Sequence, residues 1–220
     1  MNRPIFITGI GTDVGKTLIS AIVTEALAAD YWKPVQAGFA AGTDAELVKQ
    51  LVTNKTSVIH DELYRLRTPA SPHIAAKLDG IIIDADNIIQ TAQSLMSLAS
   101  PRHLVIEGAG GLLVPLADGL MVADIIKKLQ AKLILVSRNY LGSINHSLLT
   151  AAYCKNRGLD VLGWIFNDDY LSYEAEIVKW SGYPSMGSVP NLALIDSASV
   201  TEQALRLKES LTDKLNANND

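Results

Sequence analysis

Gly9-Ile10-Gly11-Thr12-Asp13-Val14-Gly15-Lys16-Thr17 follows the apolar run Ile5-Phe6-Ile7 near the start of the chain. A β-branched strand, a glycine-rich turn and a helix that opens with Lys-Thr together predict a cradle for a nucleoside triphosphate. Glycines let backbone N–H groups point at an anion, and the dipole of the next helix adds to the attraction. Lys16 is therefore expected to reach the terminal phosphates, and the Thr17 hydroxyl to coordinate Mg²⁺.

The spacing of these glycines departs from the commonest phosphate loop. The pattern GxxxxGK[ST] would place a glycine at position 10, where Ile10 stands, and the glycines occupy positions 9 and 11 instead. The alternative is a strand–helix turn that contains Gly-Lys-Thr by chance. The apolar strand that precedes the run favours the phosphate loop.

Composition limits the classes of protein that remain. A chain of 220 residues with 48% hydrophobic content predicts one α/β domain over residues 1–220. The formal net charge of −4 argues against a nucleic-acid or anionic-membrane partner. Cys154 is the only cysteine, which fits a reducing compartment. No signal-like leader precedes the first strand, and no long uncharged apolar stretch occurs, so a cytoplasmic protein is expected.

Strand-like and helix-like segments alternate along the whole chain. This alternation predicts a mostly parallel sheet with helices on both faces. The expected strands are residues 4–8, 31–35, 103–107, 132–137, 161–166 and 186–189. A helix follows the glycine-rich run, and further helices are expected over residues 44–52, 71–79, 84–99, 143–157, 173–180 and 200–211. The polar tail, residues 216–220, is expected to fray.

Chemically active residues follow several of the expected strands. Ligands of open α/β sheets collect beyond the carboxyl ends of the strands, so Lys33, Glu107 and Asn167 should gather near the glycine-rich run. An acid at the end of an apolar strand opposite a phosphate loop is a typical Mg²⁺ ligand. The glycine-rich residues 108–111 would let backbone approach a phosphate.

Each of these residues also has a plainer interpretation. Glu107 could be a surface acid beside a turn, and Lys33 a solvated lysine. Asp44 is a third candidate oxygen ligand, but it could equally be the N-cap of its own helix.

Six segments together resemble the dethiobiotin synthetase family. SPHIA, EGAGG and LGxINH are specific in combination, whereas each one alone is weak. In chain order the segments are GTDVGKT, KPVQAG (33–38), SPHIAA (71–76), EGAGG (107–111), LGSINH (141–146) and GWIFND (163–168). The resemblance implies a fold like that of the phosphate-loop NTPases. It also implies an ATP- and Mg²⁺-dependent ligase that makes dethiobiotin, ADP and phosphate from 7,8-diaminopelargonic acid, CO₂ and ATP. The resemblance further implies a homodimer with its sites at the subunit interface.

The resemblance also implies a role for each matching position. Lys16 and Lys33 would be catalytic and would hold phosphate and carbamate oxygens, while Thr17, Asp44 and Glu107 would serve the metal. Asn167 would recognise adenine, and the amides of residues 142–145 would bind the substrate carboxylate across the dimer interface. The remaining nucleotide-binding positions would be Thr12, Asp13, Val14, Gly15, Leu18, Gly108, Ala109, Gly110, Asp168, Pro190, Asn191 and Leu192. The remaining substrate-binding positions would be Ala37, Ser71, Gly142, Ser143, Ile144 and Asn145.

Departures from the family pattern concern the two ligand pockets. Ala37 stands where many members carry a hydroxyl that bonds the carbamate, so that contact is either missing or supplied by Gln36 or a backbone amide. The link from the first helix to Lys33 is short, and so is the stretch from Gly38 to Asp44, which bears on the geometry of the diamine pocket. Asn191 replaces a larger apolar or aromatic residue found near the nucleotide in some members.

Two other classes of enzyme share a similar scaffold. Switch ATPases of the plasmid-partition or septum-placement type carry an extra lysine early in the phosphate loop, but this chain has Ile10, Gly11 and Thr12 there. Glutamine-fed amidating synthetases need an appended glutaminase domain, for which this chain is expected to be too short.

Overall fold

Alternation along the first strand places side chains on both faces of a central sheet. In the computed structural model, which describes residues 3–217, β1 spans Ile5–Gly9 and is buried throughout. Phe6 packs into the core on one face, whereas Ile5 and Ile7 pack into the core on the other. Because successive strand residues point in opposite directions, an unbroken apolar strand needs helices on both faces of its sheet.

The central sheet has seven strands in the order β11-β10-β9-β1-β6-β2-β4, and all of its pairings are parallel. Its other strands are β2 (Asp30–Trp32), β4 (Ile59–His60), β6 (Leu104–Gly111), β9 (Lys132–Arg138), β10 (Val161–Asn167) and β11 (Ser185–Val189). Two small sheets lie outside it: β3 (Val35–Ala37) pairs with β5 (Tyr64–Leu66), and β7 (Pro115–Ala117) pairs with β8 (Leu120–Met121).

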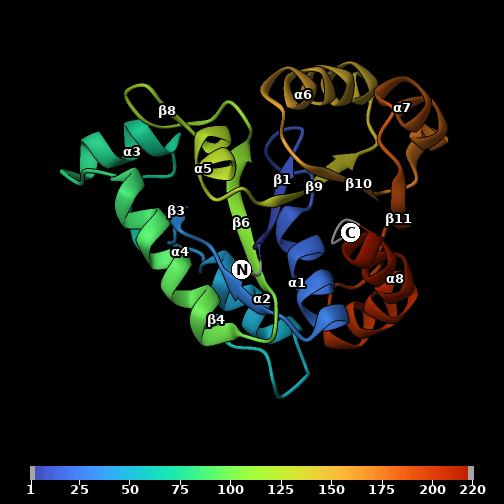
Figure 1. The fold of residues 1–220 in the computed structure, drawn as a ribbon, viewed down its shortest axis with the longest axis horizontal. Coiled ribbons are helices and arrows are strands. Elements are labelled where there is room, and N and C mark those ends of the chain that lie inside the picture. Colours follow the sequence, from blue (N-terminus) through green and yellow to red (C-terminus); the bar gives the residue numbers. More distant parts are fainter. Residues whose placement is uncertain (1–2, 218–220) are drawn as a thin grey trace.

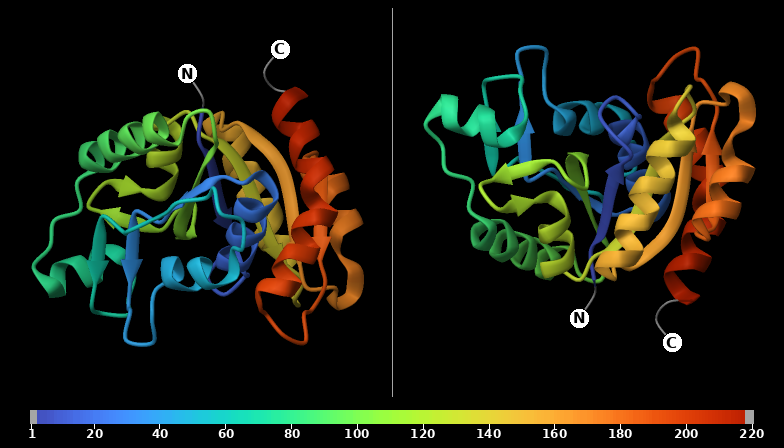
Figure 2. Two further views of the ribbon diagram at one scale, coloured as in Figure 1. Left: turned by 90° about the horizontal axis from the view of Figure 1, so that it is seen from below. Right: turned by 90° about the horizontal axis from the view of Figure 1, so that it is seen from above.

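Helices cover both faces of the sheet (Figures 1 and 2). One face carries α1 (Lys16–Leu27), α2 (Asp44–Leu51) and α8 (Ser197–Ala217). The other carries α3 (Pro72–Asp79), α4 (Ala85–Ala99), α5 (Val122–Lys128), α6 (Ser143–Arg157) and α7 (Glu174–Ser181). A 3₁₀ turn, η1, spans Tyr170–Ser172. The predicted α/β fold is confirmed.

Two predictions about strands were wrong. The expected strand 31–35 is broken, because β2 ends at Trp32 and the chain then turns through Lys33 and Pro34 into β3, which belongs to another sheet. Proline has no N–H to donate to a ladder, so a strand cannot simply run on through it. Glu107 does not end its strand, since β6 continues to Gly111.

The predicted frayed tail was also wrong in part. Residues 216 and 217 are helical, because α8 extends beyond the expected end at residue 211 and Leu215 is buried against the core. The remainder of that tail, residues 218–220, lies outside the described residues. Among residues 3–217, no helix combines the length and the apolar character that a membrane crossing requires.

A buried carboxylate ties the start of β2 to the loops beside it. Asp30 accepts hydrogen bonds from Arg102 Nε and Nη2, at 3.0 and 3.1 Å, and from the backbone N–H of Val58, at 3.0 Å. Burial opposes the charged form, but the bonds from Arg102 and Val58 outweigh it and hold the pKa of Asp30 below its ordinary value of 3.8. The ionised carboxylate therefore stabilises the fold above pH 3.8, and this contribution is lost as the pH falls through the folded-state pKa.

Replacing Asp30 with asparagine is expected to lower the free energy of unfolding by about 1.5–3 kcal/mol at pH 7, because the bonds to a charged acceptor are lost. Urea unfolding of both proteins between pH 7 and pH 3 measures the difference. The two free energies should converge at acidic pH, where Asp30 of the parent protein is protonated. A difference that is constant across this range would contradict the assignment.

Candidate functional site

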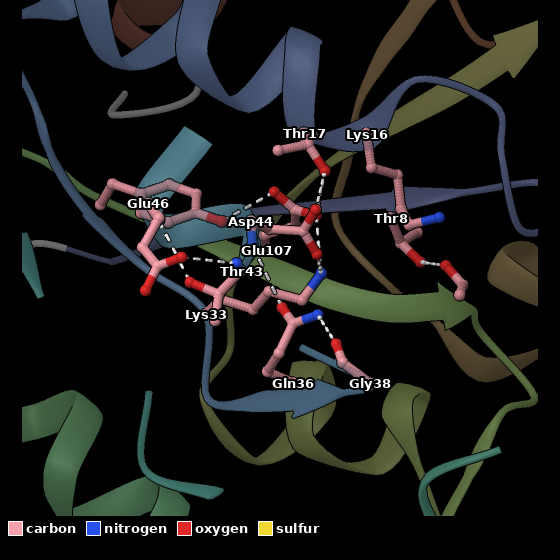
Figure 3. A network of polar contacts seen from close by, with 12 residues as sticks. Thr8, Lys16, Thr17, Lys33, Gln36, Gly38, Thr43, Asp44, Glu46 and Glu107 are labelled. Carbon is pink, nitrogen blue, oxygen red and sulfur yellow. Dashed lines mark hydrogen bonds and ion pairs between the residues drawn. The ribbon is translucent and has the colours of Figure 1, made fainter. Parts of the chain in front are cut away.

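A cluster of polar side chains lies where β2 and β6 approach the first turn of α1 (Figure 3). Thr17 comes from α1, Asp44 is the first residue of α2, and Glu107 lies within β6. Lys33 follows β2 at the break before Pro34. The predicted gathering of Lys33, Thr17 and Glu107 at one edge of the sheet is therefore confirmed.

The contacts in this cluster are short and specific. Thr17 Oγ1 lies 2.8 Å from Asp44 Oδ1 and 3.0 Å from Glu107 Oε1. Lys33 Nζ donates to Glu107 Oε1 at 2.9 Å and to Asp44 Oδ2. The Glu107 side chain is 0% exposed and that of Lys33 only 7%, so their ion pair is shielded from solvent.

Burial and charge act on these groups in opposite directions. Burial disfavours the charged form of Lys33, but Glu107 and Asp44 outweigh it and raise the pKa of Lys33 above its ordinary value. Burial likewise opposes ionisation of Asp44, and the neighbouring Lys33 outweighs it and lowers the pKa of that carboxyl. Lys33 and Asp44 therefore face each other as a charged pair.

Asp44 is available to the site because other residues cap its helix. Thr43 is the N-cap of α2: its side chain accepts from the Glu46 backbone N–H at 3.2 Å, and Glu46 Oε2 accepts from the Thr43 backbone N–H at 2.9 Å. The N-cap interpretation of Asp44 is therefore wrong. Gln36 Oε1 accepts from the Asp44 backbone N–H at 3.3 Å, while Gln36 Nε2 donates to Gly38, so this side chain already has partners.

A second lysine lies on the glycine-rich loop. Lys16 is buried, and its Nζ donates to the Gly11 carbonyl at 2.9 Å. Burial lowers the pKa of Lys16, and the charge of Lys33 acts in the same direction, although nearby carboxylates oppose both. Gly15 adopts φ +91°, and a Cβ there would lie 2.1 Å from Asn167 Nδ2, so a larger residue would not fit.

One buried tyrosine that the sequence analysis did not select contacts the cluster. Tyr31 OH donates to Glu107 Oε2 at 2.9 Å. Burial, together with the charges of Glu107 and Asp44, raises the pKa of Tyr31 well above its ordinary value, so this group acts as a neutral donor.

The oxygen atoms of this cluster suit Mg²⁺. Thr17, Asp44 and Glu107 offer a hydroxyl and two carboxylates, which are hard ligands, beside the loop expected to hold phosphates. Residues 3–217 contain no group of three or more His, Cys, Asp or Glu side chains arranged to hold a metal ion. Mg²⁺ commonly takes only one or two carboxylates from a protein and the rest of its ligands from phosphates and water, so the residues present fit it.

A cavity of about 760 Å³ opens beside the cluster. It brings together twelve of the predicted site residues: Thr12, Asp13, Gly15, Lys16, Thr17, Lys33, Ala37, Asp44, Ser71, Glu107, Ala109 and Gly110. Five further lining residues, Val35, Pro69, Ala70, Pro72 and Val114, were not predicted, and Gln36 was expected only as a substitute for Ala37. Val35 and Pro72 lie within the motifs KPVQAG and SPHIAA, and Pro69 and Ala70 directly precede the second motif, so the motifs themselves could have indicated these residues.

A second cavity, of about 610 Å³, also borders the loop and shares Thr12 and Asp13 with the first. Five positions predicted to bind the nucleotide line it: Thr12, Asp13, Val14, Asp168 and Asn191. Its unpredicted lining residues are Arg138, Asn139, Tyr140, Leu141 and Tyr170. Arg138 Nε pairs with Asp168 Oδ2 at 3.3 Å. Arg138 comes directly after the expected strand 132–137, and this position could have indicated that it belongs to the site.

Several predicted positions line neither cavity. Asn167 contacts the glycine-rich loop directly, because its Nδ2 donates to the Val14 carbonyl at 3.1 Å. Gly108 is held against Phe6, since a Cβ there would lie 2.8 Å from that ring. Leu18 is buried within α1, and Pro190 and Leu192 follow β11. Gly142, Ser143, Ile144 and Asn145 lie at the N-terminal end of α6.

A third, smaller cavity of about 320 Å³ borders α6. Thr12 and Val114 separate it from the main cavity, since both residues line both spaces. Leu113, His146 and Leu149 also line it. Thr12 borders all three cavities, so they meet at the glycine-rich loop.

Known proteins resemble this chain at two levels. A family model described as an AAA domain matches residues 3–199. The ATP-dependent dethiobiotin synthetase BioD of Christiangramia forsetii is 46% identical over 212 residues, which cover 96% of this chain and 99% of that protein. The protein of the same name from Cytophaga hutchinsonii is 46% identical over 204 residues, which cover 92% and 95%. The cell division ATPase MinD of Pyrococcus furiosus is similar in fold alone, with a TM-score of 0.60 and 13% identity over 97% of this chain and 99% of that one.

Proposed function

This chain belongs to the dethiobiotin synthetase family, and we propose that it forms dethiobiotin from 7,8-diaminopelargonic acid, CO₂ and ATP, with release of ADP and phosphate. The observation that carries the proposal is the Lys33 ammonium held between Glu107 and Asp44, at the edge of a cavity that also borders the glycine-rich loop. A cation at this position would lie between the triphosphate and the carbamate, which supports the proposal.

The first step needs two anions brought together. One amine of the diamine combines with CO₂ and loses a proton to give a carbamate, and a carbamate oxygen then attacks the γ-phosphorus of ATP. Lys16 and Lys33 offset the repulsion between the reactants, and the backbone amides of the loop hold the phosphates in line. The bond from the γ-phosphorus to the bridging oxygen breaks, and ADP leaves.

The second step closes the ring. The other amine attacks the carbonyl carbon of the resulting carbamic–phosphoric anhydride, the bond from that carbon to the phosphate oxygen breaks, and the amine loses a proton. Phosphate leaves and the ureido ring remains. No residue of the chain needs to act as a covalent nucleophile, because positioning and charge neutralisation supply the catalysis, and orientation alone is worth about 7–11 kcal/mol.

Thr17, Asp44 and Glu107 would hold Mg²⁺ together with phosphate oxygens of ATP. When bound, the ion neutralises charge on the phosphates. Lys33 bonds both carboxylates, so it would share them with the ion. The base and ribose would occupy the cavity that Asp168 and Asn191 line.

A homodimer completes this proposal. Within one chain, residues 142–145 line neither of the two larger cavities, although the family resemblance assigns their amides to the substrate carboxylate. Leu113 and Leu149, at the cavity beside α6, and Leu141, just before that helix, are exposed apolar residues of the kind that a second subunit would cover. We propose that this dimer is cytoplasmic, in keeping with the single cysteine of the chain.

Replacing Leu149 with aspartate is therefore expected to weaken the dimer by about 2 kcal/mol or more, because a buried charge would replace an apolar contact. Sedimentation should detect monomers, and ring closure should fall while ATP binding persists. Leu205→Asp is the matched control, since Leu205 is a similarly exposed leucine on α8, over the opposite face of the sheet. A fully active monomer would overturn the shared site.

The decisive assay measures phosphate release from MgATP with and without 7,8-diaminopelargonic acid and bicarbonate, with the product followed by mass. Release that requires both, with one dethiobiotin formed per phosphate, supports the proposal. Slow ATP hydrolysis that ignores the diamine would instead favour a switch ATPase. Switch ATPases share this fold but carry an extra lysine early in the phosphate loop, where this chain has Ile10, Gly11 and Thr12.

A further inference from the structure

We propose that Tyr31 is a positioning residue for the Glu107 carboxylate: its buried hydroxyl holds one oxygen so that the other faces the bound Mg²⁺. The inference rests on the proposed function only in placing a divalent cation at Glu107.

The geometry of the sheet brings these two side chains together. In the pairing of β2 with β6, Tyr31 lies opposite Val105, and Glu107 is two residues farther along β6. Residues two apart on a strand point to the same face, and a long aromatic side chain can reach such a diagonal neighbour. Tyr31 and Val105 both pack into the core beneath α1 and α2. The phenol therefore approaches Glu107 from the protein interior.

The two oxygens of Glu107 have different partners. Oε2 accepts only the Tyr31 hydroxyl among the contacts of the described residues, at 2.9 Å, whereas Oε1 lies within 3.0 Å of both Thr17 Oγ1 and Lys33 Nζ. A carboxylate without the tyrosine could rotate about its last torsion, which has a broad energy profile. The hydroxyl bond removes that freedom and leaves Oε1 directed at the cluster.

Tyr31 acts through Glu107 and not on a ligand directly. Its side chain is fully buried, and it is absent from the residues that line the main cavity. Groups that orient a metal ligand from behind typically change metal affinity by about 10–100-fold when they are removed.

Tyr31→Phe, which keeps the ring and deletes the hydroxyl, provides the test. The readout is ATP binding measured by calorimetry at increasing Mg²⁺, without diamine or bicarbonate, so that the result is independent of ring closure. The Mg²⁺ concentration for half-maximal enhancement of ATP binding should rise about 10–100-fold, while ATP binding in EDTA should not change. Tyr64→Phe is the matched control, because its hydroxyl accepts bonds from the Asp84 backbone N–H and from Asn87 Nδ2, neither of which belongs to the cluster.

A double-mutant cycle separates positioning from a structural role. In a Glu107→Ala background, the further change Tyr31→Phe should leave the Mg²⁺ requirement unchanged, because there is no carboxylate to orient. Tyr31→Met, a second variant without the hydroxyl, should reproduce the defect if the phenylalanine variant is too unstable to assay. An unchanged Mg²⁺ requirement in a folded hydroxyl-free variant, or an equal increase in the Glu107→Ala background, would overturn the proposal. Absence of diamine-dependent turnover in the parent protein, with Mg²⁺-dependent ATP binding intact, would count against the proposed reaction and not against the role of Tyr31.

Discussion

Replacing Lys16 with alanine is expected to lower the rate of ring closure by at least about 100–1,000-fold, the usual cost of removing one group that stabilises charge developing in a transition state. The Lys16 ammonium is buried on the glycine-rich loop, where it bonds the Gly11 carbonyl. Its structural bond is a single contact to a backbone oxygen, worth about 1 kcal/mol, so the fold should survive.

Steady-state kinetics with MgATP, diamine and bicarbonate measure the loss, and urea unfolding checks the fold. Lys127→Ala is the matched control, because Lys127 also donates to a backbone carbonyl, that of Arg157 at 3.3 Å, but lies on α5 away from the loop. Near-normal turnover by a folded Lys16→Ala protein would remove this lysine from the mechanism.

Replacing Lys33 with alanine should affect stability as well as turnover. The change leaves Glu107, whose side chain is 0% exposed, without its cation, and removal of one partner from a buried ion pair typically costs about 3–5 kcal/mol. Turnover should fall at least as far as in Lys16→Ala, because the cation between the two reacting anions is gone. Urea unfolding in metal-free buffer and the same kinetic assay measure the two effects.

The origin of the stability loss can be isolated with a second substitution. In Lys33→Ala/Glu107→Gln the buried negative charge is absent, so the double variant should be more stable than the sum of the two single losses predicts. Strictly additive losses would mean that Lys33 does not stabilise the fold through Glu107.

The long periodic elements were readable from the sequence, and the short ones were not. The helices at 72–79, 85–99 and 143–157 carry start or stop signals such as Pro72, Asp84 and Gly158, and they form where expected. The strands β4 and β5 are too short to have a period, and β3 pairs outside the main sheet. The spacing of Val122, Ile125 and Ile126 was an available signal for α5.

The residues of the candidate site also fall into those that local motifs indicated and those that they did not. Lys16, Thr17 and Glu107 belong to local motifs, so the residues themselves indicated their place at the sheet edge. The partnership of Tyr31 with Glu107 depends on the register between β2 and β6, which no local pattern encodes. The N-cap of α2 is Thr43 and not its neighbour Asp44. Threonine and aspartate are both favoured at N-caps, so the sequence alone could not decide between them.

The extension of β6 to Gly111 has a consequence for the thermodynamics of nucleotide binding. Gly111 pairs with Gly9, and a Cβ on Gly111 would lie 3.1 Å from the Gly9 carbonyl oxygen, so the base of the glycine-rich loop is part of the central sheet. The conformational entropy of this segment is therefore lost when the chain folds and not when ATP arrives. A preorganised loop leaves more of the contact energy to appear as affinity, and the entropy of binding should carry little unfavourable contribution from loop ordering.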